Sequence, residues 1–463
     1  MLFFMVSLVT AYTSRNLIFE QRISVNLYRS NMAFEAAESG MEWLIGMLSA
    51  GRITETCVEA TATTANTTFR QRYLNIDSTT GLVTPRIRSN NTPLNATCIW
   101  GDTESWVCSC PNDGPTVLAT TAAAGLHPAF RVQFNVLQAI DVRPGLIQVI
   151  VNACVNGADQ ACLSDFSNTP RDSEGRAQNT QVLGFKNALT TPPVAALTVV
   201  GNVAGGSALA VQNTDIASGG VTIQAAGTIN TTGLNLRGVP GTPGARTVVA
   251  NDSSMVPDGL TLNATSLPSR AAEFQLIPAV ADTTAARTEK WERVLAAPFG
   301  MLPSTYRLQP SALSMPCPDT GCQQALSNLA ALNPGRVIWI VNDNGTPSNL
   351  TLELAGDIGS LPDPANAAVA GPVSLVVTGR VNVVNPAVRI FGHVYVRSFN
   401  SNPTADSWTG GGTVRGGLLI EGNLPTAAFP TVVYEQAVID ALRRSSGSFV
   451  RMPGTWRDFY QAP

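Results

Sequence analysis

The first fifty residues carry hydrophobic side chains at helical spacing and contain few residues that break helices. Residues 1–14 include no charge, glycine is absent before Gly40, and proline is absent before Pro85. This pattern predicts one α-helix over residues 1–51, which ends at Gly51. At about 1.5 Å per residue such a helix extends ~75 Å, which exceeds the width of a small domain. We therefore expect it to protrude from the molecule or to pack against other copies.

The uncharged start of this helix is shorter than a membrane span. Residues 1–14 cover ~21 Å, against a hydrocarbon core of roughly 30 Å. No basic segment precedes the apolar run and no small-residue cleavage pattern follows it, so we expect a start that is already processed or trimmed. Such a tip suits a helix that sits in a bilayer before assembly and in an apolar filament core afterwards.

Residues 19–43, FEQRISVNLYRSNMAFEAAESGMEW, resemble the N-terminal helix of PilX-type minor pilins of type IV pili. That family carries a Leu-Glu-Glu-Arg-Met stretch, an Asn, and then Asn-x-Ala-Phe-x-Ala-Ala-Glu. The matching positions here are Phe19, Glu20, Arg22, Asn26, Asn31, Ala33, Phe34, Ala36, Ala37 and Glu38. The chain departs from the major-pilin pattern at Met5, where a Glu is expected if Met1 is the mature terminus.

The resemblance implies a structural subunit of a type IV pilus, located in the inner membrane before assembly and in an extracellular pilus afterwards. It implies other pilin subunits as partners through the helix, together with a tip adhesin of the PilY family. The residues expected to pack in the filament are Leu2, Phe3, Phe4, Met5, Val6, Leu8, Val9, Leu17, Phe19, Glu20, Arg22 and Phe34.

Residues 52–190 form a second predicted unit, rich in Thr, Asn and Cys. The runs FRVQFNVLQAI (130–140) and GLIQVIVNAC (145–154) resemble strands, and Pro144 with Gly145 suggests a turn between them. We therefore predict a hairpin over 130–155. In pilins, such a sheet lies on the C-terminal half of the helix, and we expect a pilin-like β domain with disulfides here.

Residues 191–463 form a third predicted unit, in which short β-branched runs end in Gly or Asn every ten to fifteen residues. This spacing suits stacked, solenoid-like β structure, and it also suits a β-sandwich. A helical insert is expected at 284–332 and a further helix at 434–444. The predicted fold class is α+β: a long protruding N-terminal helix followed by a large β-rich head with a short helical insert.

The closing segment PGTWRDF (453–459) also resembles the end of large PilX-like proteins. We expect Trp456 and Phe459 to cap the β core, with Arg457 and Asp458 paired at its edge, because terminal aromatic residues commonly tie down a chain end.

The chain has eight cysteines and no CxxC pair, which favours disulfides over zinc and an oxidising compartment. The local pairs Cys154–Cys162 and Cys317–Cys322 are expected. The other four cysteines allow three connectivities, one of which is Cys57–Cys110 with Cys98–Cys108.

Composition argues against several function classes. Charged residues are 13% of the chain and the net charge is −3, so no face can collect enough Lys and Arg to bind nucleic acid. Only His127 and His393 are present, and no catalytic motif was found, so we expect no enzyme, no cofactor and no metal. The NDNG sequence at 342–345 places its glycine too early for an EF-hand calcium loop.

Three other hypotheses keep the helix. The protein could be the principal subunit of a filament that it decorates along its whole length. It could be a secreted adhesin or carbohydrate-binding module for which the helix is a membrane anchor. It could also be the large pseudopilin of type II secretion, which the glycine-punctuated head fits less well.

Overall fold

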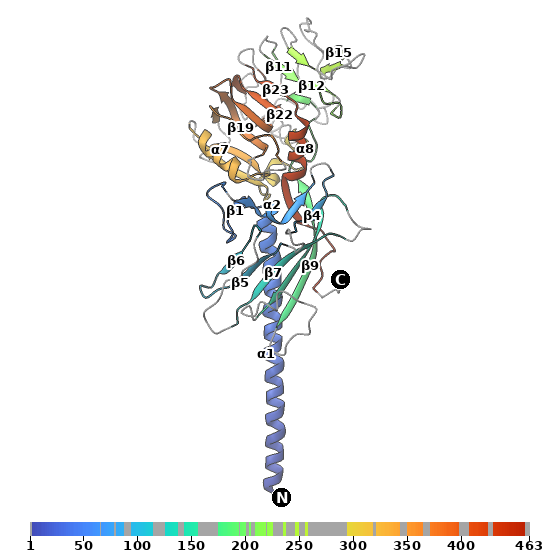
Figure 1. Ribbon diagram of the computed structural model, residues 1–463, viewed down its shortest axis with the longest axis vertical. Coiled ribbons are helices and arrows are strands. Elements are labelled where there is room, and N and C mark those ends of the chain that lie inside the picture. Colours follow the sequence, from blue (N-terminus) through green and yellow to red (C-terminus); the bar gives the residue numbers. More distant parts are fainter. Residues whose placement is uncertain are drawn as a thin grey trace, which may run out of the picture.

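The computed structural model shows a long helical rod that carries a β-rich head (Figure 1). It describes residues 2–64, 66–77, 80–87, 94–113, 126–137, 143–155, 175–193, 195–200, 203–204, 209–218, 220–225, 235–237, 246–249, 255–257, 294–317, 321–342, 350–363, 371–397, 407–424 and 429–458. The rod is α1 (Leu2–Leu48), a single helix of 47 residues. This confirms the long N-terminal helix expected from the sequence.

An antiparallel sheet of six strands packs against the C-terminal half of α1 (Figure 1). In order across the sheet, its strands are β24 (Gly447–Arg451), β9 (Arg176–Asn187), β8 (Leu146–Cys154), β7 (Ala129–Asn135), β5 (Ala96–Trp100) and β6 (Trp106–Ser109). The β7–β8 pair confirms the hairpin predicted over 130–155. Small elements beside α1 are β1 (Arg52–Ile53), β2 (Thr67–Thr68), α2 (Phe69–Tyr73), β3 (Leu74–Ile76) and β4 (Val83–Pro85).

The rest of the head is a stack of parallel strands. Along the stack they run β14 (Arg246–Val249), β12 (Val221–Ala225), β10 (Ala195–Val199), β22 (Thr413–Ile420), β20 (Arg389–Arg397), β19 (Val373–Val383), β17 (Val337–Asn342) and β16 (Ala312–Cys317). The strand β15 (Met255–Pro257) pairs antiparallel with β14 at one end. Of the two architectures open at the sequence level, stacked parallel strands are the one observed.

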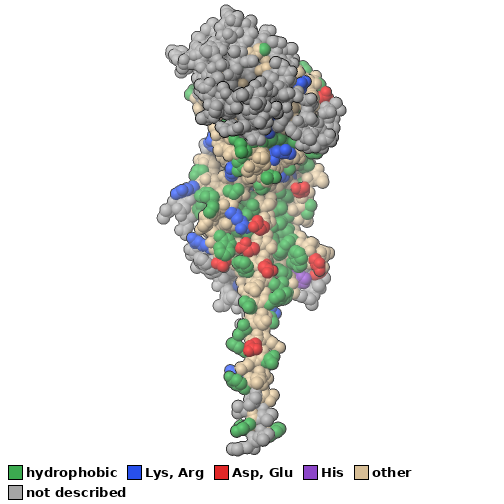
Figure 2. Space-filling view, turned by 180° about the vertical axis from the view of Figure 1, so that it is seen from behind, with side chains coloured by type: hydrophobic (Ala, Val, Ile, Leu, Met, Phe, Trp, Pro, Cys, Tyr) green, Lys and Arg blue, Asp and Glu red, His purple; other side chains and the backbone are tan. Residues whose placement is uncertain are grey.

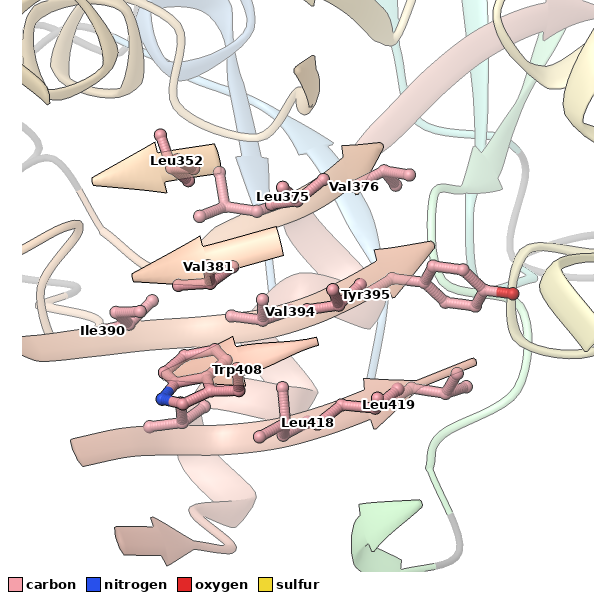
Figure 3. Close-up of a cluster of buried hydrophobic side chains, with 14 of the residues drawn as sticks. Leu352, Leu375, Val376, Val381, Ile390, Val394, Tyr395, Trp408, Leu418 and Leu419 are labelled. Atoms are coloured by element: carbon pink, nitrogen blue, oxygen red, sulfur yellow. The ribbon is translucent and has the colours of Figure 1, made fainter. Parts of the chain in front are cut away.

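A second row of short parallel strands faces this stack. It contains β18 (Leu350–Leu354), the second half of β19, and β21 (Trp408–Gly410), with β11 (Ala210–Gln212), β13 (Asn235–Arg237) and β23 (Thr431–Val433) further along. Figure 3 shows the two rows and the hydrophobic side chains between them. Leu352, Val381 and Trp408 are aligned on one row, opposite Leu375, Val394 and Leu418 on the other.

The chain enters and leaves this stack at its middle. It begins at β10, moves outward through β12 and β14, and later re-enters at the opposite end with β16. It then advances through β17, β19 and β20 to β22, which pairs with β10. One aliphatic ladder crosses that junction without interruption: Leu313, Ile338, Leu375, Val394, Leu418, Leu197 and Ile223.

The whole stack is inserted between two neighbouring strands of the first sheet. Strand β9 ends at Asn187 and β24 begins at Gly447, and these two residues are direct partners in the antiparallel pair. Residues 447–458, which we expected in the C-terminal domain, therefore lie on the first sheet. The reason is that β24 completes the edge of that sheet beside β9, a pairing between residues far apart in sequence.

Helical segments flank the stack. A turn of helix spans 294–299, followed by α6 (Pro303–Tyr306) and by α7 (Gln323–Leu332), which lies beside β18. The helix α8 (Gln436–Ser445) follows the last strand of the stack and packs on β20, β22 and β9. Part of the expected insert, residues 284–293, lies outside the described residues.

Candidate functional site

The N-terminal part of α1 extends below the head with its hydrophobic side chains exposed (Figure 2). Phe3 is 86% exposed, Phe4 73% and Phe19 66%. The other large hydrophobic residues exposed on this part of the helix are Met5, Tyr12, Leu17, Ile18, Ile23, Val25, Leu27 and Tyr28. Because isolated apolar side chains on a surface are ordinary but a contiguous set is not, this region, residues 2–28, is the candidate functional site. We call it the exposed rod.

Hydrophobic side chains lie on every side of the exposed rod. With about 3.6 residues per turn, Ile18, Phe19, Leu27 and Leu17 point in four directions spaced about 80–100° apart around the helix axis. A helix that packs into a single groove needs only one apolar stripe, whereas a helix that is hydrophobic all round is one that becomes buried. The exposed rod is thus suited to being surrounded.

The upper half of α1 differs, because one face of it is filled by small residues that the sheet covers. Ala33, Ala36, Ala37 and Gly40 are all buried, and they continue into the larger buried residues Met41, Leu44 and Leu48. A Cβ atom added at Gly40 would lie 2.8 Å from both Phe130 Cδ2 and Val151 Cγ1. The small residues therefore set how closely helix and sheet approach.

Polar contacts hold the upper half of α1 to the end of the chain. The Glu38 carboxylate accepts hydrogen bonds from Asn179 Nδ2 (2.5 Å) and from the Trp456 indole N–H (3.0 Å). Arg451 of β24 pairs with Glu42 at 2.7 Å. These contacts orient the rod relative to the sheet.

The closing segment therefore lies on the first sheet and on α1. The backbones of Arg457 and Thr180 exchange hydrogen bonds at 2.9 and 2.8 Å. Trp456 remains 44% exposed, so the expectation that it caps the β core is wrong: its indole needs a partner for its N–H, and Glu38 provides one on the surface. Phe459 lies outside the described residues.

A buried arginine joins the rod to both parts of the head. Arg70 of α2 donates from Nη2 to the Leu48 carbonyl (2.9 Å) and to the Gly447 carbonyl (2.7 Å), and from Nη1 to the Ser445 carbonyl (2.7 Å). Leu48 and Ser445 end α1 and α8, so the guanidinium occupies the negative ends of two helix dipoles. Burial, with a smaller effect of nearby Arg336, lowers the Arg70 pKa to about 10, so the group stays charged at neutral pH.

Two further arginines bind carbonyl groups around the same joint. Arg52 donates to the Ala331 carbonyl in the last turn of α7 (2.8 Å) and to the Asn66 carbonyl (2.6 Å). Arg72 donates to the carbonyls of Thr54, Cys110 and Ile53. The joint between rod and head is therefore built from guanidinium groups on backbone oxygens.

Three disulfides are present among the described residues: Cys57–Cys110, Cys98–Cys108 and Cys317–Cys322. The first two resolve the three connectivities that the sequence left open. The bridge expected between Cys154 and Cys162 involves residue 162, which lies outside the described residues. Residues 343–345 of the NDNG segment also lie outside the described residues.

Four titratable groups of the stack, His393, Tyr395, Arg397 and Glu421, are enclosed. His393 is 1% exposed and faces the Phe299 ring, and burial lowers its pKa to about 4, so its imidazole is neutral. The Tyr395 hydroxyl donates to the Glu421 carboxylate, which also lies 3.4 Å from Arg397 Nε. Burial, and then Glu421, raise the Tyr395 pKa well above its usual value.

Two absences hold for the described residues. They contain no group of three His, Cys, Asp or Glu side chains arranged to hold a metal ion. None of their helices, α1 included, is long and apolar enough to cross a lipid bilayer.

Most of the residues predicted to pack in a filament lie on the exposed rod. Phe3, Phe4, Met5, Leu17, Phe19, Glu20 and Arg22 are exposed, and so is Phe34 at 39% beside the head. Leu2, Val6, Leu8 and Val9 belong to α1, but their side chains are outside the described set. The exposed rod also contains hydrophobic residues that the prediction did not name: Tyr12, Ile18, Ile23, Val25, Leu27 and Tyr28. The sequence does contain a signal for these residues. The face of small residues begins at Ala33 and marks where the sheet starts to cover the helix, so hydrophobic residues before Ala33 are expected to be exposed.

Comparisons with known proteins leave the family open. No family model and no curated protein matches the chain. Among solved structures, it is similar to the competence-associated pilin ComZ from Thermus thermophilus, with a TM-score of 0.19 and 10% identity over 93% of this chain and 98% of that one.

Proposed function

We propose that this protein is a structural subunit of a type IV pilus-like filament, and that its role is assembly, not catalysis. The observation that carries the proposal is the exposed rod, which is hydrophobic all round and has no cover within its own chain among the described residues. In a filament, the rods of neighbouring subunits surround one another, and the heads lie outside. The same helix would sit in the inner membrane before assembly and in an extracellular pilus afterwards.

Burial of the exposed rod supplies the driving force in water. Burying a large apolar side chain contributes about 1.5–3 kcal/mol, so the exposed Phe, Leu, Ile and Val residues together suffice to make association strong. In transfer from a bilayer to the filament that contribution largely cancels, because lipid tails are as apolar as leucine. Packing between the rods and pairing of their polar groups then hold the subunit.

The finer proposal comes from the resemblance of residues 19–43 to PilX-type minor pilins. It makes this protein a subunit present in few copies, with the large head displayed at the surface or tip. Other pilins would be its partners through α1, and a PilY-family adhesin would be a further partner. Counting copies per filament tests this against a principal subunit, which would be present once per helical rise.

The assembly proposal is tested with Phe19→Asp, which puts a charge into the middle of the exposed rod. We expect the variant to fold and to fail to enter filaments, because an unpaired carboxylate in an apolar bundle is strongly disfavoured. The control is Ile87→Asp, at a residue of the head that is 60% exposed, against 66% for Phe19. Normal incorporation of the Phe19 variant, measured in purified filaments, would overturn the proposal.

A further inference from the structure

The exposed rod carries three charged side chains among its hydrophobic ones. Arg15, Glu20 and Arg22 are all exposed on α1. Arg15 and Arg22 are seven residues apart, so with about 3.6 residues per turn they lie within about 20° of each other around the axis. Glu20 lies about 140° from Arg15 and about 160° from Arg22. The rod thus has a basic face and an acidic face on opposite sides.

These charges cannot neutralise one another within one helix. Side chains pair on a helix when they are three or four residues apart, and Glu20 is five residues from Arg15 and two from Arg22. Burying them unpaired in an apolar bundle would be costly, since charges removed from water must be paired. If the rods are surrounded as proposed above, each charge needs a partner from a neighbouring subunit.

Opposite faces also determine the kind of contact. In a two-fold dimer, the same patch of both copies meets, so each patch would have to contain both signs of charge. Here the basic patch of one copy meets the acidic patch of the next, and each copy retains one face for another neighbour. Contacts of this heterologous kind repeat into an open helical filament when the rotation does not close.

We propose that the Arg15–Arg22 face of one copy of this chain packs against the Glu20 face of a second, parallel copy. An axial offset of five to six residues, ~8 Å at about 1.5 Å per residue, places Arg15 beside Glu20 of the neighbour. The same offset places Arg22 beside Tyr28 of the neighbour, a ring that is 59% exposed and can bind a guanidinium on its face. This inference rests on the proposed assembly function in its principal-subunit form, in which copies of this chain contact one another, and it specifies the stagger of that contact.

The test uses charge reversal in the full chain. Glu20→Arg makes both faces basic, and the double variant Arg15→Glu with Arg22→Glu makes both faces acidic. We expect each variant alone to lose at least about tenfold in polymer that sediments after removal of detergent, because like charges then meet in a desolvated contact. In an equal mixture, copies of the two variants can alternate so that every contact joins a basic face to an acidic face, and we therefore expect the mixture to recover most of the wild-type polymer.

The matched control is Glu104→Arg, which makes the same reversal at an exposed residue of the head. It should polymerise like the wild type. If Glu20→Arg polymerises like that control, or if the mixture of reversed variants fails to recover, the pairing of faces is wrong while the assembly function stands. If the wild-type chain alone does not polymerise, the contact between copies of this chain is wrong, while assembly with other pilin subunits stands. Normal incorporation of the Phe19→Asp variant into filaments is the result that overturns the assembly function.

Discussion

The two β regions of this molecule bury their strands in different ways. In the sheet beside α1, strand β7 alternates between buried and partly exposed positions, because one face packs on the helix and the other faces water. In the stack, all five residues of β10 are buried, and so are the first six of β19. The adjacent strands β20 and β22 have the stack interior on one side and α8 on the other, and strands covered on both faces in this way carry continuous hydrophobic runs.

The cores of the two regions differ accordingly. The first contains an aromatic cluster formed by Trp43, Phe69, Tyr73, Phe130 and Phe134, around which the helix and sheet pack. The stack contains ladders of aliphatic side chains, in which the side chains of each strand pack against those of the neighbouring strands (Figure 3). One region is stabilised by a single three-dimensional core and the other by nearest-neighbour contacts along one direction. The joint at Arg70 links the two regions, so its loss should show whether they unfold together.

The largest effect is expected for Arg70→Met, which removes the guanidinium that contacts both α1 and α8 at the joint. The buried carbonyl groups of Leu48 and Gly447 and the partly buried Ser445 carbonyl then lose their donor. At about 1–3 kcal/mol for each of the two buried groups, we expect a loss of roughly 2–6 kcal/mol in the free energy of unfolding. The two regions should also unfold in separate transitions, as measured by calorimetry. Arg86→Met is the control, because the exposed Arg86 side chain donates only to the Gln71 carbonyl among the contacts described. A single unshifted transition in the Arg70 variant would show that the regions are coupled elsewhere.

The next effect concerns pH and is confined to the stack. The His393 pKa falls from 6.5 in the unfolded chain to about 4 in the folded one because the imidazole is buried. The unfolded chain therefore binds a proton that the folded chain does not, and stability falls as the pH drops from about 6.5 to about 4. The loss attributable to this group is about 3 kcal/mol.

Replacing His393 by Gln should remove that part of the pH dependence. The measurement is the unfolding free energy of the stack at pH 6.5 and pH 4, for the wild type and the variant. The expected result is a smaller difference between the two pH values in the variant. An identical difference in both proteins would mean that His393 is not the group responsible.

The smallest effect is expected in the region beside α1. Gly40→Ala places a methyl group against Phe130 and Val151, and overpacking of this kind costs about 1–3 kcal/mol. Gly46→Ala is the matched control on the same helix, since nothing lies within 4 Å of the added Cβ. It should stabilise the protein by about 0.5–1 kcal/mol through helix propensity. Chemical denaturation measures the free energy of unfolding of both variants. Equal changes in the two would show that contact with the sheet does not restrict the side-chain size at Gly40.

Local patterns in the sequence predict the separate elements well. The helical spacing and the absence of proline before Pro85 predict α1, because helix formation depends on residues three and four apart. The apolar and β-branched run in residues 145–154 predicts β8, and the turn residues before it predict its pairing with β7. The exposure of the rod also follows, since a helix of that length exceeds what its own chain can cover.

The tertiary structure alone decides how these elements combine. Nothing in the sequence of residues 447–451 indicates that they pair with β9. The sequence of β10 likewise does not indicate that it lies next to β22. In both cases the partners are more than two hundred residues apart and are selected by packing. The buried role of Arg70 is likewise invisible locally, since its three carbonyl partners come from α1, α8 and β24. Short-range spacing determines helices and strands, whereas the match of side-chain volumes and hydrogen-bonding groups across the folded chain determines their neighbours.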